Sequence, residues 1–272
     1  MKHIITTTLL LLALLLPTHA LAHDFEVDGI YYNINGTNAT VTYKGDHFNS
    51  YSNEYSGSVT IPATVTYSGT IYSVTSIGYG AFEYCSSLTA IDIPYSVTTI
   101  GDYAFYYCSS LTNIDIPNSV TNIGDDAFSD CSKLMSVTIE GPISRIQHST
   151  FYNCRKLQTV RLPYDLISIG EKAFYFCEDL TDVTCLAKTP PSIEKYNSIY
   201  PGYYMATLHV PAQSVEAYKA TDWWSHFINI EGDASNDASD PATSPVNKCD
   251  TNDDGEVNIA DINKVIDAIL TN

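Results

Sequence analysis

The stretch SIGYGAFEYCSSLTAIDIP (residues 76–94) decides the fold, because four close variants of it follow along the chain. The copies keep a period of 23 residues, with no insertion or deletion between their shared positions. A fixed period of this length is typical of stacked supersecondary units, each of which buries its apolar face only against its neighbours. Two of the invariant slots hold Phe82, Phe105, Phe128, Phe151 and Phe174, and Cys85, Cys108, Cys131, Cys154 and Cys177.

Each repeat predicts a short strand and then a turn onto the far side of a coil. The segment LTxIxIP alternates apolar and polar residues as a half-buried strand does, and its proline ends the strand by removing a donor. Stacked strands of this kind form a parallel sheet with neighbours ~4.8 Å apart. The predicted fold class is therefore a mainly β solenoid with little α-helix.

The segment IGxxAF supplies the turn. We expect its glycine to adopt a backbone conformation that other residues resist. That glycine occurs as Gly78, Gly101, Gly124 and Gly170. The fourth copy departs from the pattern, because Glu140 takes the proline slot and Gln147 takes the glycine slot.

The repeat LTxIxIPxSVTxIGxxAFxxCSS resembles the BspA-type leucine-rich repeat of bacterial surface proteins over roughly residues 58–231. The resemblance implies a right-handed stack of leucine-rich-repeat coils. It also implies adhesion to other cells or to components of the extracellular matrix.

A stack of coils needs atypical units at both ends. The segment FEVDGIYYNINGTNATVTY (25–43) predicts a β-hairpin within an N-terminal β cap (23–57). Residues 58–232 form the repeat domain, which closes with a final strand, a helix from about Gln213 and a tryptophan-bearing cap (206–230).

Residues 1–22 predict a secretory signal peptide cleaved after Ala22. Lys2 and His3 precede an apolar run over residues 9–16, and PTHALA follows. The run is too short for a membrane anchor, which needs ~18 or more consecutive apolar residues, and no later segment qualifies. We therefore expect a secreted or cell-surface protein without a transmembrane segment in the mature chain. The full sequence has a net charge of −18, which disfavours nucleic acid as a partner and favours a cation.

Four roles compete for the repeated cysteine. A zinc site usually needs a second Cys or His a few residues away, which no repeat cysteine has, and a catalytic thiol would not recur in every copy. Disulfides are compatible with export, but stacked cysteines would all point inward, and an odd number of them cannot all pair. We favour a small buried side chain packed beside the phenylalanine. Cys185 is interpreted in the same way, while a Cys177–Cys185 bridge stays open.

Two sets of variable positions define the candidate binding surface. Outward strand positions are the natural binding face of a solenoid, and they include Asp92, Asn113, Asp115 and Arg161. The two residues after each phenylalanine are rich in tyrosine, which offers rigid contact area with a polar tip. These tyrosines are Tyr84, Tyr106, Tyr107, Tyr152 and Tyr175. With Tyr95, Tyr103 and Tyr164 they would form a stripe along one edge, unless the rings only pack between coils.

A polar, proline-containing linker (233–247) follows the repeat domain. The segment after it has oxygen-bearing residues at loop positions 1, 3, 5, 7, 9 and 12 of a calcium site, with Gly255 at the sharp turn. The six predicted ligands are Asp250, Asn252, Asp254, Glu256 through its carbonyl, Asn258 and Asp261. Asp261 replaces the bidentate glutamate of an EF-hand loop, and an amphipathic helix follows.

Residues 248–272 resemble a dockerin type I repeat, DxNxDGxVNxxD with its helix. The resemblance implies calcium as a cofactor and a cohesin-like module as a candidate partner. A dockerin ordinarily has two such repeats packed together, whereas this sequence shows one. Its helix therefore needs another surface to cover its apolar face. Cys249, next to the loop, lies outside the repeat pattern and is a candidate free thiol.

The sequence contains no HExxH, GxSxG, P-loop or dinucleotide-binding glycine motif, so we predict a protein that is not an enzyme. The first hypothesis is a secreted or cell-surface protein that recognises proteins or glycans of host or neighbouring cells. The second is a component of an extracellular complex, docked through residues 248–272.

Overall fold

The computed structural model describes residues 23–45, 47, 53–194 and 205–233. The predicted signal peptide, calcium loop and Cys249, and the linker beyond Asp233, lie outside these residues. Within the described part of the chain, no helix is long and apolar enough to cross a membrane.

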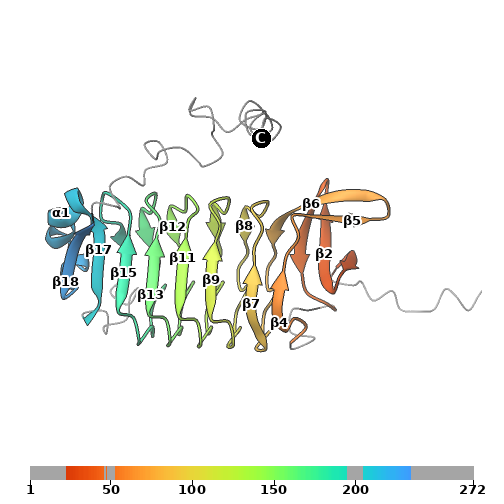
Figure 1. Cartoon of the computed structure of the whole chain (residues 1–272), viewed down its shortest axis with the longest axis horizontal. Coiled ribbons are helices and arrows are strands. Elements are labelled where there is room, and N and C mark those ends of the chain that lie inside the picture. Colours follow the sequence, from red (N-terminus) through yellow and green to blue (C-terminus); the bar gives the residue numbers. More distant parts are fainter. Residues whose placement is uncertain (1–22, 46, 48–52, 195–204, 234–272) are drawn as a thin grey trace, which may run out of the picture.

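The described residues form an elongated solenoid of stacked coils, as the repeat predicts (Figure 1). Long strands of successive coils make a six-stranded parallel sheet in the order β18-β17-β15-β13-β11-β9. Equivalent residues pair directly, so Val137 is opposite Ile114 on one side and Val160 on the other. The strands are β9 (Asn113–Ile116), β11 (Ser136–Ile139), β13 (Thr159–Leu162), β15 (Asp182–Cys185), β17 (Thr207–Pro211) and β18 (Asn229–Asp233).

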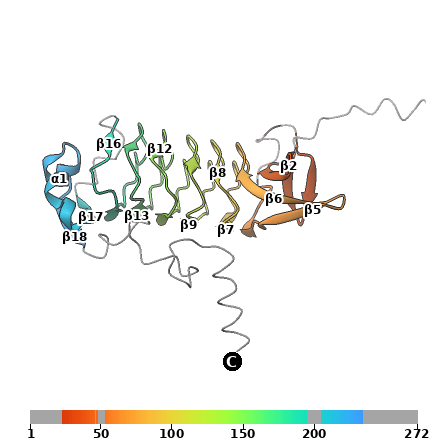
Figure 2. The same ribbon diagram turned by 90° about the horizontal axis from the view of Figure 1, so that it is seen from above.

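Short strands form a second line along the stack (Figure 2). They are β8 (Thr99–Ile100), β10 (Asn122–Ile123), β12 (Arg145–Ile146), β14 (Ser168–Ile169) and β16 (Ser192–Ile193). This line breaks between β10 and β12, which belong to different sheets. The break coincides with the fourth copy, where Glu140 and Gln147 depart from the repeat.

The predicted N-terminal hairpin is confirmed. Strand β2 (Ile30–Asn35) pairs antiparallel with β3 (Asn38–Thr42), and β1 (Phe25–Val27) adds to the far side of β2. Strand β3 then pairs in parallel with β6 (Thr70–Ile77), which joins the cap to the line of short strands. Three more strands complete this end: β4 (Gly57–Thr60), β5 (Thr64–Tyr67) and β7 (Leu88–Asp92).

The C-terminal cap also follows the prediction. The expected helix starts as a 3-10 turn (Ala212–Ser214) and continues as α1 (Val215–Ala220). A second 3-10 turn (Trp224–His226) brings the buried Trp224 onto the last coil, where its Nε1 donates to the Pro191 carbonyl at 2.7 Å. Strand β18, which closes the long-strand sheet, was not predicted.

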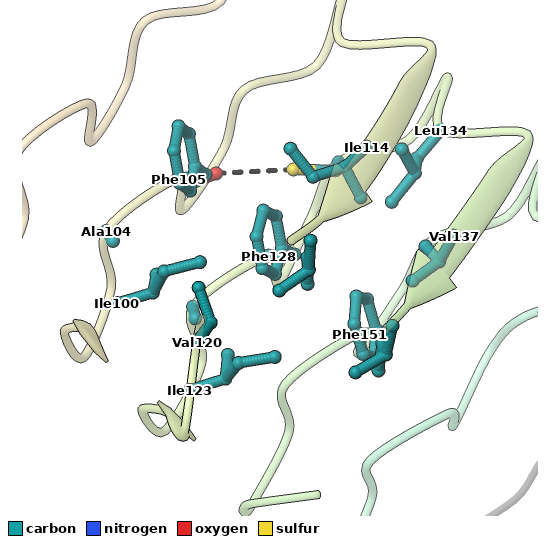
Figure 3. Packing of buried hydrophobic residues seen from close by; sticks show 14 of the residues in the cluster. Ile100, Ala104, Phe105, Ile114, Val120, Ile123, Phe128, Leu134, Val137 and Phe151 are labelled. Atoms are coloured by element: carbon teal, nitrogen blue, oxygen red, sulfur yellow. Dashed lines mark hydrogen bonds between the residues drawn. The ribbon is translucent and has the colours of Figure 1, made fainter. Parts of the chain in front are cut away.

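The core is a ladder of phenylalanine rings, one per coil (Figure 3). Neighbouring rings are nearly parallel, with centroids 4.9–5.4 Å apart from Phe82 to Phe174. Beside each ring lies the repeat cysteine, fully buried as expected. The cysteine also has a polar role that the sequence did not predict. Its Sγ donates to the phenylalanine carbonyl of the preceding coil, as in Cys131 Sγ to Phe105 O at 3.2 Å.

The glycine of IGxxAF serves close packing, and the prediction of an unusual backbone conformation at this position was wrong. None of the four glycines has a positive φ. Instead, a Cβ on Gly124 would lie 2.4 Å from the amide nitrogen of Asp102 in the preceding coil. Real Cβ atoms essentially never approach a backbone atom that closely. Glycine therefore allows a close approach between neighbouring coils at Gly124, whereas the fourth coil holds Gln147 in the same slot.

Candidate binding surface

The positive φ angles occur at two other positions in each coil, two and six residues after the glycine slot. One is the second residue after the phenylalanine, with φ between 57° and 63° at Tyr84, Tyr107, Asp130, Asn153 and Phe176. The other is the second residue before the phenylalanine, occupied by Gly80, Tyr103, Asp126, Ser149 and Lys172. Residues other than glycine rarely adopt this conformation, so the neighbouring coils must enforce it.

Hydrogen bonds between coils supply that constraint. The amide of Tyr84 donates to the carbonyl of Tyr106 at 2.8 Å, and the amide of Tyr107 donates to the carbonyl of Ser129 at 2.9 Å. The same bond recurs from Asp130 to Tyr152. These bonds fix the backbone of the two residues after each phenylalanine relative to the next coil. The side chains of these residues form one edge of the solenoid.

Five tyrosines of the first two coils gather on this edge, and we call them the tyrosine patch: Tyr79, Tyr84, Tyr103, Tyr106 and Tyr107. Their rings contact one another with centroid separations of 5.6–6.0 Å. Tyr79, Tyr84 and Tyr107 are 49%, 36% and 45% exposed, and Tyr103 and Tyr106 are half-buried. The patch therefore presents ring faces and edges to solvent.

The predicted continuous stripe is interrupted in the third coil. There Ser129 and Asp130 occupy the two slots after the phenylalanine. A second aromatic group follows in the last two coils, where Tyr152, Tyr175 and Phe176 contact one another at 4.4–6.4 Å. Tyr95 and Tyr164 were wrongly assigned to this edge, because they lie in the turn that follows the long strand.

Carboxylates surround the tyrosine patch. The charge of Asp126, followed by burial, raises the pKa of Tyr103, and Asp102 and Asp125 add to this effect. Two of these acids also hold the coils together: Asp102 Oδ1 accepts from the amide of Asp125 at 2.9 Å, and Asp125 Oδ1 accepts from the amide of His148 at 3.0 Å. The patch is both aromatic and acidic.

Glu83, next to Tyr84, is the one acid of this edge that is almost completely buried. It is 6% exposed, and its Oε2 has no hydrogen-bond partner. Burial raises the pKa of its carboxyl to about 7. The side chain is therefore poised to lose a proton near neutral pH, one position away from an exposed ring.

The strand-face residues form a separate surface. Asp92, Asn113 and Asp115 are exposed and Arg161 is half-buried, all on the outward side of the long strands. Ser136 Oγ donates to Asn113 Oδ1 at 2.8 Å, so these side chains bond along the sheet. The predicted binding residues thus occupy two parts of each coil, the strand and the turn before it.

Further along the same face, two carboxylates flank the imidazole of His209. Its Nε2 lies 3.6 Å from Asp182 Oδ1 and its Nδ1 lies 3.8 Å from Glu231 Oε2. Sequence reasoning missed this group because His209 and Glu231 belong to the cap rather than to the aligned repeats.

The cysteines have no features of a reactive or metal-binding site. Burial raises the pKa of Cys85 to about 11 and raises those of the other four repeat cysteines as well. The six cysteines of the described residues are all free. Within residues 23–45, 47, 53–194 and 205–233, no group of three His, Cys, Asp or Glu side chains could hold a metal ion. A thiolate is the reactive form of cysteine, so packing is the role that this geometry supports.

Two members of the patch, Tyr79 and Tyr103, lie in the variable pair of IGxxAF. In the five coils this pair reads Tyr-Gly, Asp-Tyr, Asp-Asp, His-Ser and Glu-Lys. These two positions vary from coil to coil, although the residues on both sides of them are nearly constant. That variation could have identified Tyr79 and Asp126 as candidate binding residues from the sequence.

Residues 73–197 match the family model described as "BspA type Leucine rich repeat region", in six copies. This is one copy more than the five found by aligning the sequence on itself. No curated protein gives a significant match to the chain.

Several solved structures are similar. A leucine-rich-repeat protein from T. pallidum is 20% identical, with a TM-score of 0.49, over 75% of this chain and 94% of that chain. A leucine-rich-repeat protein from Bacteroides ovatus is 22% identical, with a TM-score of 0.29, over 69% and 71%. The pneumococcal vaccine antigen PcpA is 18% identical, with a TM-score of 0.44, over 72% and 60%.

Proposed function

We propose that this leucine-rich-repeat chain, whose repeats are of the BspA type, is a secreted or cell-surface protein that recognises other proteins or glycans through the tyrosine patch. Adhesion to host or microbial partners is the role that such recognition would serve. The proposal is for binding rather than catalysis.

The third coil carries this proposal. Its Ser129 and Asp130 occupy the slots that Tyr106 and Tyr107 occupy one coil earlier, and the backbone and the phenylalanine ladder continue through both coils. The repeat therefore folds without aromatic residues at these positions. A cluster of exposed rings that folding does not require is a recognition surface of the kind that proteins build from tyrosine.

The chemistry of the patch favours a partner with cationic groups. Ring faces attract ammonium and guanidinium groups, and the neighbouring Asp102, Asp125 and Asp126 add a negative potential. Basic segments of proteins fit this description, and the hydroxyl tips also suit the hydroxyl groups of glycans. Binding should weaken as the salt concentration rises, because exposed charges are screened.

The test replaces the pair of the second coil with that of the third. The double variant Tyr106→Ser/Tyr107→Asp introduces residues that the chain already holds at equivalent positions, so it should fold as the parent does. Both proteins are assayed on immobilised matrix proteins, on a glycan array and on whole cells. We expect binding by the parent and at least a tenfold loss in the double variant, since each buried aromatic contact contributes about 1 kcal/mol or more.

A variant of the strand face, Asp115→Ala/Arg161→Ala, serves as the matched comparison. Loss of binding in this variant alone would move the site to the long strands. If the purified fragment of residues 24–232 bound neither cells nor matrix proteins nor glycans, the recognition role would be rejected.

The spacing of acidic residues in the tail supports a second candidate. Asp250, Asn252 and Asp254 begin a loop with the ligand spacing of a calcium site. We propose that residues 248–272 bind calcium and dock into a cohesin-like module, with the repeats as cargo. Calcium titration calorimetry on the full chain and on Asp254→Ala tests the site. Complex formation that survives deletion of residues 248–272 would contradict the docking role.

A further inference from the structure

The row of long strands begins at β4, and the outer edge of β4 is open. Among the described residues, β4 pairs only with β7, in a two-stranded parallel sheet (Figure 1). The hairpin cap extends the other line of strands, through β3 and β6. Among the described residues, the cap therefore covers one side of the first coil and leaves the long-strand side without a further strand.

The direction of the backbone bonds shows which groups are free. Gly57 and Ile61 donate their amides to the carbonyls of Ser87 and Asp92, on the β7 side. Alternate residues of a strand direct their N–H and C=O groups to the same edge. Ser58 and Thr60 consequently direct theirs to the open edge, where no partner lies among the described residues. Both residues are exposed.

A cavity of about 370 Å³ adjoins this edge. One wall is formed by Ser58, Val59 and Thr60 of β4, and the other by the start of the hairpin cap, with Val27, Asp28 and Tyr32. The space is large enough to take a long side chain from a segment lying along β4. It is not an internal packing gap, because polar and apolar groups share its lining.

The lining holds two buried oxygen atoms that lack hydrogen-bond partners. One is the hydroxyl of Tyr32, a residue with 0% exposure, and the other is Oε1 of Glu54. Tyr55, in the same wall, shows the contrast, since its hydroxyl accepts from the amide of Tyr31 at 3.1 Å and donates to the carbonyl of Thr42 at 2.7 Å. Neither oxygen is exposed to solvent. A buried polar group without a partner is costly, so a ligand donor that reaches these oxygens through a side-chain shift would be favoured.

The charge of the lining is one-sided. It contains the carboxyl groups of Asp28 and Glu54 and no Lys, Arg or His. Burial raises the pKa of Glu54 to about 7, against the opposing effects of the Lys44 amide, which donates to Oε2, and of the Lys44 charge, although Lys44 does not itself line the cavity. A cation placed beside this carboxyl would be attracted to it and would favour its ionised form.

We propose that the open edge of β4 binds an extended peptide segment of a partner protein, with a lysine or arginine side chain of that segment in the adjoining cavity. Main-chain hydrogen bonds to Ser58 and Thr60 would supply the strand pairing, as in other cases of strand addition. The cavity would supply the selectivity for a basic side chain through Glu54, Asp28 and the Tyr32 hydroxyl. This second site is independent of the tyrosine patch.

The experiment uses the full chain and fluorescein-labelled peptides of the form Thr-Val-Xaa-Val-Thr-Val, with Xaa as Lys, Arg, Gln or Glu. Fluorescence anisotropy should show saturable binding of the Lys and Arg peptides and binding about tenfold weaker or more for the Gln and Glu peptides. Glu54→Gln should abolish the preference for Lys over Gln. Tyr32→Phe should weaken binding and leave stability equal to or higher than that of the parent, because the buried hydroxyl makes no hydrogen bond in the unbound protein.

Two variants of Thr60 separate the contribution of its backbone amide from that of its side chain. Thr60→Pro removes the outward amide donor but no β4–β7 bond, and edge strands tolerate proline at such positions. Thr60→Ala removes only the side chain. We expect about a tenfold loss or more for Thr60→Pro and parent affinity for Thr60→Ala. Peptides N-methylated at alternate amides give the same test without altering the protein.

Three outcomes would overturn the proposal: no saturable binding of any peptide, equal binding by Thr60→Pro and the parent, or a concentration-dependent dimer that Thr60→Pro abolishes. The last would show that a second copy of the chain occupies the edge. The double variant Tyr106→Ser/Tyr107→Asp should bind the peptides as the parent does, so failure of this site and failure of the tyrosine patch are distinguishable.

Discussion

Phe128 stands in the middle of the phenylalanine ladder, and Phe128→Ala should remove two ring contacts at once. Its ring lies between those of Phe105 and Phe151, with centroids 5.0 and 5.4 Å away, and it is fully buried. Truncating a buried phenylalanine to alanine costs about 3–5 kcal/mol of unfolding free energy. Stacked pairs add about 0.5–1.5 kcal/mol each beyond burial, so we expect a loss in the upper half of that range.

The loss should be visible in urea and thermal unfolding followed by far-UV circular dichroism. In a domain of this size, 1 kcal/mol lowers the Tm by about 2–4 °C, so the expected decrease is about 8–20 °C. Phe128→Leu, which refills part of the space, should lose less. Tyr107→Asp is the surface control and should lose no stability, because Asp130 already occupies the equivalent slot.

If Phe128→Ala lowered the unfolding free energy by less than about 1 kcal/mol, the phenylalanine ladder would not be the main source of core stability. A loss of that size is typical of an average substitution and not of a buried core ring. An equal loss for Tyr107→Asp would contradict this role of the ladder too, since the exposed edge would then contribute as much as the ladder.

The remaining predictions concern the carboxyl, the glycine and the thiols. Burial raises the pKa of Glu83 from 4.5 to about 7, so its contribution to stability is complete below pH 4.5 and is lost as the pH rises through 7. Glu83→Gln should therefore raise the unfolding free energy by about 1–3 kcal/mol at pH 8 and have little effect in acid, as measured by urea unfolding across pH. Gly124→Ala should cost about 1–3 kcal/mol in the same assay, because its Cβ would meet the backbone of Asp102. A Cys249→Ser variant should show no fast-reacting thiol toward Ellman's reagent at pH 8 until urea unfolds it, and fast labelling of the folded protein would contradict the buried, protonated state of the other six cysteines.

The stack, its strands and its core were predictable from the sequence because they depend on side chains that repeat. One apolar slot per coil produces one buried column, and Phe82 to Phe174 form that column in the structure. The hairpin cap was predictable for a similar reason, since turn residues between two alternating runs select an antiparallel pair.

Contacts between coils were harder to predict. A glycine in a repeat has two physical explanations, backbone freedom and close approach, and only coordinates show that Gly124 faces the backbone of Asp102. The open edge of β4 depends on which strands the cap covers, a property of topology that the residues of β4 do not reveal. Ser129 and Asp130 show in the sequence that the tyrosines fall into two groups. Only the structure shows that the rings within each group contact one another.

The left-handed backbone of the slot after the phenylalanine gives a separate reason to regard the tyrosine patch as functional. Asparagine and aspartate adopt this conformation readily, whereas other residues with a Cβ are destabilised by about 1–2 kcal/mol. Asn153 and Asp130 fill the slot in two coils, yet Tyr84, Tyr107 and Phe176 fill it in the others with φ near 60°. Folding alone would therefore favour Asn or Asp in every coil. Tyr107→Asn should leave the unfolding free energy equal or higher by up to about 1 kcal/mol, and still weaken partner binding. A destabilised Tyr107→Asn protein would mean that the ring stabilises the fold by more than its backbone conformation costs, and the aromatic edge would then need no partner to explain it.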